Sequence, residues 1–191
     1  MIIFACTILL LVAALFSQFW FPGRARVFQV IFLFSIVVIC SLYLLLVYLQ
    51  YATWKEAGPP SSFLIPPYRS ALYVFSYHFM RFGLWYVISL ALALAFFAFG
   101  TFLNKKFGEK FFRPEEMNLA ALAIFCLGNP EWKYAWLYYF FALGIISVIG
   151  ALALRYAFRS PRRFSFYWLW IPTAIGVIIG MSILQFLISN F

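Results

Sequence analysis

The chain has 191 residues, of which 66% are apolar, 24% are aromatic and only 10% are charged. A soluble core of this size cannot hide so much apolar surface, so the composition excludes an ordinary soluble domain and indicates that lipid is the solvent. The net charge of +9 comes from short basic clusters between apolar runs. This is the topology signal of a membrane protein, and we expect membrane lipids, and no nucleic acid, as partners.

Few side chains suit catalysis or metal binding. The sequence has no aspartate and one histidine, His78. Cys6, Cys40 and Cys126 lie far apart inside apolar runs, so we expect inert thiols rather than a redox pair or a metal cluster. We therefore expect no metal, no other cofactor and no catalytic dyad or triad. The acids are five glutamates: Glu56, Glu109, Glu115, Glu116 and Glu131.

The apolar runs predict an all-α, multi-spanning membrane helix bundle. The first span covers about residues 1–20. No basic residue precedes it and no small-residue cleavage pattern follows it, so we expect an uncleaved span rather than a removed signal peptide. After the first fixed charges, Arg24 and Arg26, residues 27–48 form the second span.

A proline-rich connector follows at residues 50–67. Its two proline pairs stiffen the chain and prevent a continuous helix. It serves either as a docking loop for a partner or as a spacer to the next helix. Residues 68–82 then mix aromatic residues with Arg69, His78 and Arg81. This mixture predicts an interfacial helix at the level of the lipid headgroups, or the wet end of a long third helix.

The third span runs over about residues 83–103. Within it, Ala91, Ala95 and Ala98 place small residues at helical spacing. A face of small residues lets two helix backbones approach closely in a membrane. We therefore predict that this alanine face packs against another helix.

Two further long spans are expected near the end of the chain, over about residues 134–154 and 166–188. The last contains Gly176 and Gly180. These two glycines form a GxxxG step, which is typical of close helix packing in membranes.

Between these long runs lies a short one, residues 114–128, which determines how the chain is threaded. Pro114 suits the first turn of a helix, and Glu115 and Glu116 suit the positive end of the helix dipole. Gly128 and the following Asn-Pro form a stop signal. A helix of about fifteen residues reaches about 22 Å, less than the ≈ 30 Å hydrocarbon core. It either crosses the membrane as a short span or re-enters on the same side.

The distribution of cations favours a full crossing. With six spans, ten cations face one side and four face the other, whereas with five spans the count is seven against seven. Because the positive-inside rule favours asymmetry, we predict six spans, with both termini on the non-cytoplasmic side and residues 50–67 external. Local thinning of the bilayer, or shielding by neighbouring helices, would then accommodate the short span. The ten cations are Arg24, Arg26, Lys105, Lys106, Lys110, Arg113, Arg155, Arg159, Arg162 and Arg163, against Lys55, Arg69, Arg81 and Lys133.

This threading places Glu115 and Glu116 at the cytoplasmic start of the short helix, which makes them, with Asn118, the candidate polar site. Two interpretations remain open. In the first, the carboxylates stabilise the helix start and balance nearby cations. In the second, one carboxylate binds a cation or a proton, and Asn118 assists from the next turn.

Residues 112–182 resemble the C-terminal half of the type IV prepilin peptidases. The resemblance rests on Glu-Met-Asn-Leu-Ala-Ala-Leu from Glu116, on Leu-Gly at 127 and 128, and on RFSFYWLWIPTAIG after a basic connection. It implies that Glu116 occupies the place of the family's second catalytic aspartate and Asn118 that of its lysine. The family's preceding glycines are replaced here, and no aspartate can complete the catalytic pair. The resemblance thus implies a shared scaffold without the peptidase chemistry.

Three functions remain open. We favour a non-enzymatic accessory or structural subunit of a membrane assembly, which contacts a protein partner or a second copy through its small-residue faces. The short fourth helix suggests a small-solute transporter, or its membrane-embedded binding subunit, because discontinuous helices line substrate sites in such proteins. The third is a degenerate prepilin-peptidase-like intramembrane protein. We expect an integral protein of a bacterial cytoplasmic (inner) membrane, although the charge pattern itself gives only the orientation relative to a cytoplasm-like side.

Overall fold

The computed structural model describes residues 2–108, 112–156 and 165–189. Over these residues the protein is all-helical, as predicted, and contains no β-strand. Five helices in this part of the chain are long and apolar enough to cross a membrane, which is the character of an integral membrane helix bundle. These candidate spans are Ile2–Trp20, Ala25–Glu56, Ala71–Lys106, Ala135–Ala153 and Trp170–Ile188.

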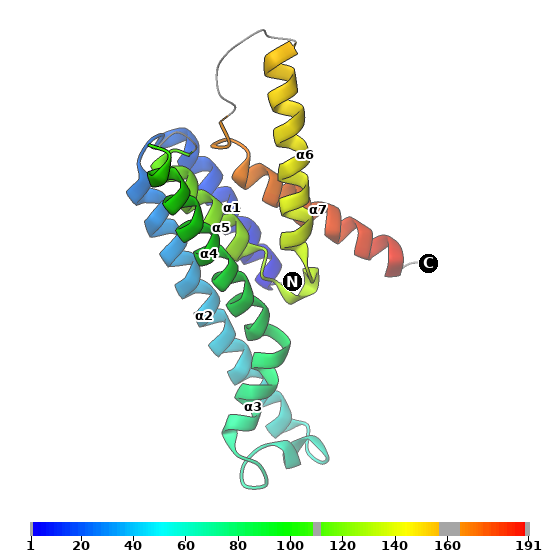
Figure 1. The fold of residues 1–191 in the computed structure, drawn as a ribbon. Helices are drawn as coiled ribbons and strands as arrows, with labels where there is room; N and C mark the ends of the chain where they lie inside the picture. The colour runs from blue at the N-terminus through cyan, green and yellow to red at the C-terminus, as the bar shows by residue number, and fades with distance from the viewer. Residues whose placement is uncertain (1, 109–111, 157–164, 190–191) are drawn as a thin grey trace.

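The short helix α5 contacts α1, α2, α4 and α7. Figure 1 shows α1, α2 and α4 running alongside α5, while α7 crosses at an angle. The remaining long helix, α6, leads away from this bundle. The elements are α1 (Ile2–Trp20), α2 (Ala25–Glu56), η1 (Ser61–Leu64), α3 (Ala71–His78), η2 (Phe79–Gly83), α4 (Leu84–Lys106), α5 (Pro114–Cys126), η3 (Pro130–Trp132), α6 (Ala135–Tyr156) and α7 (Trp170–Ser189).

Two of these helices are longer than the sequence pattern indicated. α2 continues through Tyr48 and Trp54 as far as Glu56, because no glycine or proline interrupts it before Gly58. α3, the π-helical turn η2 and α4 form one continuous helix of 36 residues, so residues 71–82 are the beginning of the long third helix. Residues 50–56 of the predicted proline-rich connector therefore belong to α2. Residues 57–70 join the end of α2 to the start of α3 and contain the short turn η1.

The short helix α5 is buried on almost all sides. It has 13 residues and a length of about 20 Å at 1.5 Å per residue. Every side chain from Glu115 to Cys126 is buried except that of Asn118. Because α1, α2, α4 and α7 surround it, α5 needs no lipid-facing surface of its own. The structure thus shields the short helix α5 by its neighbours.

The closest helix packing in the described residues is between α4 and α5. A Cβ atom added to Gly100 would lie 2.5 Å from the Met117 sulfur, and one added to Gly128 would lie 2.6 Å from the Ser89 Cβ. The Ser89 hydroxyl also donates to the carbonyl oxygens of Ile124 and, at 3.3 Å, Phe125. The small residues on α4 that permit this contact are Ser89, Ala93 and Gly100.

The predicted alanine face of this helix does not make the α4–α5 contact. Ala91, Ala95 and Ala98 are exposed, and they lie on the side of α4 that faces away from α5. A helix turns by about 100° per residue, so a run with small residues at many positions offers more than one small-residue face. The serine at position 89 and the glycine at position 100 mark the face that is used.

The glycine pair of the last helix also lacks a close contact within the described chain. A Cβ atom added to Gly176 or Gly180 would have no other heavy atom within 4 Å, apart from the backbone of its own helix. The same holds for Gly144 on α6. The predicted GxxxG face is therefore not used to pack this chain against itself, and it lies open.

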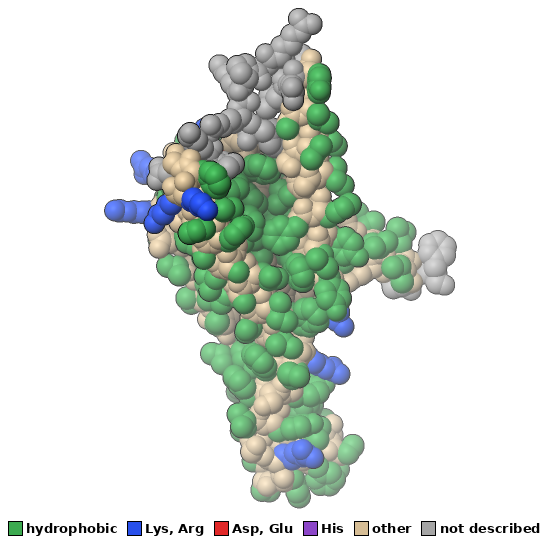
Figure 2. All heavy atoms as spheres, in the orientation of Figure 1, with side chains coloured by type: hydrophobic (Ala, Val, Ile, Leu, Met, Phe, Trp, Pro, Cys, Tyr) green, Lys and Arg blue, Asp and Glu red, His purple; other side chains and the backbone are tan. Residues whose placement is uncertain are grey.

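The described cations gather mainly at one end of the bundle, where the α1–α2 turn, the end of α4 and the start of α5 meet. Figure 2 shows this group at the upper left, and further cations lie singly toward the other end. The group comprises Arg24, Arg26, Lys105, Lys106 and Arg113. Of the remaining cations in the predicted set of ten, Lys110, Arg159, Arg162 and Arg163 and the side chain of Arg155 lie outside the described residues.

Candidate functional site

The predicted carboxylates lie at the start of α5, inside the bundle. Glu115 is 5% exposed and Glu116 is 2% exposed. The Glu116 Oε1 atom accepts a hydrogen bond of 3.0 Å from the Ser165 hydroxyl, which in turn accepts one of 3.3 Å from the Tyr167 amide. The other carboxylate oxygen, Oε2, is buried and has no hydrogen-bond partner in the described part of the chain. Within the described residues, the side-chain partner of Glu116 thus bonds one of its two carboxylate oxygens.

A second buried polar group, Gln18, lies at the same end of the bundle. Gln18 of α1 is fully buried. Its Nε2 donates to the Tyr167 carbonyl at 2.6 Å, and the Tyr167 hydroxyl donates to the Gln18 carbonyl at 3.2 Å. These two bonds link α1 to the segment before α7. The Gln18 Oε1 atom, like Glu116 Oε2, has no hydrogen-bond partner among the described residues.

Tyr167 connects these two groups. It precedes the first residue of α7 and is buried beside Phe28 of α2, with 6.3 Å between the ring centroids. Burial raises the pKa of its phenol, the nearby Glu115 carboxylate raises it further, and Arg113 lowers it. The phenol therefore stays protonated at neutral pH and remains a hydrogen-bond donor to α1.

The start of α5 is fixed by a pair of side-chain bonds. Asn104, at the end of α4, donates through Nδ2 to the Phe112 carbonyl at 2.8 Å and accepts from the Phe112 amide at 3.1 Å. Pro114 then begins the helix, since a missing amide hydrogen costs nothing in the first turn. This clamp holds the connection so that Glu115 and Glu116 face inward.

Asn118 does not join the carboxylates. It is partly exposed, and its Nδ2 atom lies 3.5 Å from the Pro114 carbonyl of its own helix, at the limit of a hydrogen bond. The groups that accompany Glu116 are instead Ser165, Tyr167 and Gln18, which the sequence analysis did not single out. A glutamine within an otherwise apolar span was the available signal, because buried amides in a membrane need partners.

The side chains at the Glu116 end of the bundle limit the chemistry that this end can support. The described residues contain no group of three histidine, cysteine, aspartate or glutamate side chains that could hold a metal ion. Glu56 ends α2 and Glu131 lies in η3, so neither belongs to the same end of the bundle as Glu116. Among the described residues, the carboxyl groups here come only from Glu115 and Glu116. A buried carboxylate with one unpaired oxygen can hold a proton or a small cation.

Comparisons of the chain with protein-family models, with characterised proteins and with solved structures gave no match.

Proposed function

We propose that this chain is a non-enzymatic accessory subunit of a membrane assembly, and that it binds an apolar transmembrane helix of a partner subunit. The docking surface is the open limb, defined as residues 144–153 of α6 and residues 179–188 of α7. The observation that carries the proposal is that no described side chain of the open limb is buried, although each segment belongs to a candidate membrane span.

The open limb combines exposure with small residues. Near the point where α6 and α7 cross, the Tyr139 hydroxyl of α6 donates to the Trp170 carbonyl of α7 at 3.1 Å. Beyond that point they diverge, as Figure 1 shows. Gly144 and Gly180 leave open positions along the diverging faces. Helix association in membranes depends on close backbone approach at such positions, so one further helix fits this geometry.

The proposal includes a threading. We propose that α5 crosses the bilayer, that the chain has six crossings, and that the cation-rich end faces the cytoplasm of a bacterial inner membrane. Asn104 and Phe112 hold the start of α5 at this cation-rich end. The segment after α5 contacts the start of α1, where the Phe4 and Trp132 rings are 5.4 Å apart. These contacts favour an α5 that runs from one end of the bundle to the other.

Site-specific photocrosslinking in the native membrane tests the partner. A photoreactive amino acid is placed at Ile145 and at Ile183 of the open limb, with Leu33 and Val37 of α2 as controls of similar exposure. We expect a discrete protein adduct from the limb positions and only lipid adducts from α2. Lipid adducts at all four positions would contradict the proposal, and an adduct with the mass of two chains would identify the partner as a second copy.

The unpaired oxygen of Glu116 favours a second candidate, a solute transporter that uses this carboxylate for a coupling cation or proton. The variant Glu116→Gln distinguishes a transporter from an accessory subunit. The amide keeps an oxygen to accept from Ser165, but it takes up no proton near neutral pH and has no negative charge to hold a cation. A transporter would lose cation-coupled uptake in proteoliposomes, while an accessory subunit would keep its partner. Glu131→Gln, at the other end of the bundle, is the control.

A further inference from the structure

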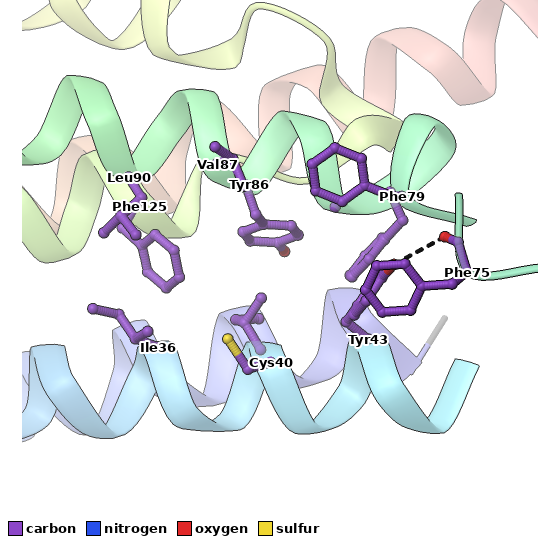
Figure 3. A pocket seen from close by; sticks show the side chains of 12 residues that line it. Ile36, Cys40, Tyr43, Phe75, Phe79, Tyr86, Val87, Leu90 and Phe125 are labelled. Atoms are coloured by element: carbon purple, nitrogen blue, oxygen red, sulfur yellow. Dashed lines mark hydrogen bonds between the residues drawn. The ribbon is translucent and has the colours of Figure 1, made fainter. Parts of the chain in front are cut away.

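An apolar cavity lies between α2 and the long third helix, just beyond the end of α5. Its volume is about 230 Å³ and its wall surface is entirely apolar. Figure 3 shows the side chains of α2 and α4 facing one another across it. Half of the lining residues are aromatic, namely Tyr43, Phe75, Phe79, Phe82, Tyr86 and Phe125.

The cavity exists because α5 is short. Phe125, near the C-terminal end of α5, closes one end of the cavity and makes an edge contact with Tyr86, with ring centroids 5.7 Å apart. Beyond it α2 and the third helix continue, and no helix lies between them in the described structure. At the other end the Tyr43 hydroxyl donates to the Phe75 carbonyl at 3.0 Å. α2 and the long third helix, which comprises α3, η2 and α4, are thus linked at both ends of an unfilled space.

The π-helical turn shapes the wall of the cavity. η2 covers Phe79 to Gly83, and such turns change the direction in which side chains leave a helix. A Cβ atom on Gly83 would lie 2.7 Å from the Phe79 ring and 3.3 Å from the Tyr43 ring. The glycine therefore lets both rings close over the helix backbone beside the cavity.

Water is a poor occupant of this space. A buried water molecule needs two to four polar partners, and an apolar cavity of about 150 Å³ stays dry but accepts benzene. A hydrocarbon segment therefore suits the larger cavity found here. Cys40, Phe75 and Val87 contribute to the wall and are also exposed on the outer face of the helices. Both helices are candidate membrane spans, so this mouth faces lipid.

We infer that the cavity between α2 and the long third helix is a binding site for one acyl chain of a bilayer lipid. The chain enters between Cys40 and Val87 and ends against Phe125. An acyl chain restores the van der Waals contacts that the unfilled walls lack, and the hydrocarbon around the mouth supplies it without a polar barrier. This site is independent of the open limb and of any protein partner.

Photolabelling with a lipid tests the site. The full chain is reconstituted in nanodiscs with a phosphatidylcholine that carries a diazirine in one acyl chain, then diluted into unlabelled lipid and irradiated after increasing delays. Labelled residues are mapped by mass spectrometry. We expect labels at 36–43 and 83–90 to persist after those on the exposed face of α6 have exchanged away.

Val87→Trp places a large side chain at the mouth, at a position exposed enough to accept it, and should abolish the persistent label. Val30→Trp, at an exposed position of α2 outside the cavity and the open limb, is the matched control. The thermal midpoint of each variant shows whether it has folded. Cys40→Phe is a second variant that blocks the same mouth of the cavity. Labels at the cavity that exchange as fast as those on α6, or that survive both blocks in folded protein, would overturn the inference. So would a crosslink between two chains at these residues.

Discussion

At the scale of single residues, the glycines separate two kinds of surface in this protein. Gly128 lies where the Ser89 Cβ and the Phe125 carbonyl leave no room for a Cβ atom, and Gly100 lies against the flexible end of Met117. In contrast, Gly144, Gly176 and Gly180 lie against open space. A glycine in the first group serves packing within the chain. A glycine in the second group is available for packing against something else.

Replacing Gly128 by alanine tests this distinction within the bundle. The new Cβ would lie 2.6 Å from the Ser89 Cβ and 3.1 Å from the Phe125 carbonyl oxygen, neither of which belongs to a flexible side-chain end. We expect a loss of about 1–3 kcal/mol of stability from overpacking. Thermal unfolding in mild detergent measures it.

Gly176→Ala serves as the matched control, because its Cβ meets nothing within 4 Å. Alanine is also the better helix former, by roughly 0.5–1 kcal/mol. Its thermal midpoint should stay the same or rise. A Gly128→Ala variant as stable as Gly176→Ala would contradict the close α4–α5 contact.

The hydrogen bond from Tyr167 to α1 gives a second test at this scale. Tyr167→Phe removes the hydroxyl that donates to the Gln18 carbonyl but keeps the ring against Phe28. We expect a loss of about 0.5–1.5 kcal/mol, the usual net value of one hydrogen bond. Tyr48→Phe, at an exposed position of α2, should leave the unfolding midpoint unchanged. Equal midpoints for the two variants would argue against the Gln18–Tyr167 link.

The candidate site could be predicted from the sequence only in part. The position of Glu115 and Glu116 at a helix start followed from proline and dipole rules. Their burial did not, because it depends on Tyr167 and Ser165, about fifty residues later in the chain. Such long-range partners leave no local pattern, so the link between Gln18 and Tyr167 could not be anticipated from spacing.

At the scale of elements, α5 is the helix around which the others are arranged. The apolar runs were sufficient to predict the all-α class, because runs of about twenty apolar residues have few alternatives. The same reasoning could not identify which face of a helix packs, since nearly every face of α4 is apolar. The spacing of apolar residues does not show which face of a membrane helix packs against protein, because lipid and protein neighbours are equally apolar.

Enlarging a residue of α5 should therefore disturb the whole bundle. Ala121 has no exposed surface and is surrounded by neighbouring helices. We expect Ala121→Leu to destabilise the protein by about 1–3 kcal/mol or more through overpacking. Ala91→Leu, on the exposed face of α4, is the control and should be tolerated. Size-exclusion profiles and thermal midpoints of the two variants provide the comparison, and identical behaviour would refute the central placement of α5.

At the scale of the whole molecule, the charges match the thickness of a bilayer. Arg81 and Lys105 are 105 − 81 = 24 residues apart on one continuous helix, which is about 36 Å at 1.5 Å per residue. A hydrocarbon core of ≈ 30 Å fits between them. The helix ends beyond Arg81 carry a cluster of interfacial aromatics, in which the Trp54 and Tyr77 rings are 5.2 Å apart.

Accessibility labelling tests the proposed threading of the whole chain. Single cysteines are introduced at Lys106, Lys133 and Ser62 in a variant that lacks the three native cysteines. A membrane-impermeant thiol reagent added to intact cells should label the cysteines at positions 133 and 62 but not that at position 106. Labelling at 106 and 133 together would mean that α5 does not cross.

The enclosure of α5 also has a consequence for how the protein is made. Three of its neighbours, α1, α2 and α4, have already left the ribosome when α5 emerges, but α7 has not. Until residue 165 is synthesised, Glu116 lacks the serine that bonds it, and one side of the short helix stays uncovered. In a nascent chain halted before residue 165, α5 would be packed only loosely at the translocon. It would insert stably into the bilayer only after α7 has been made.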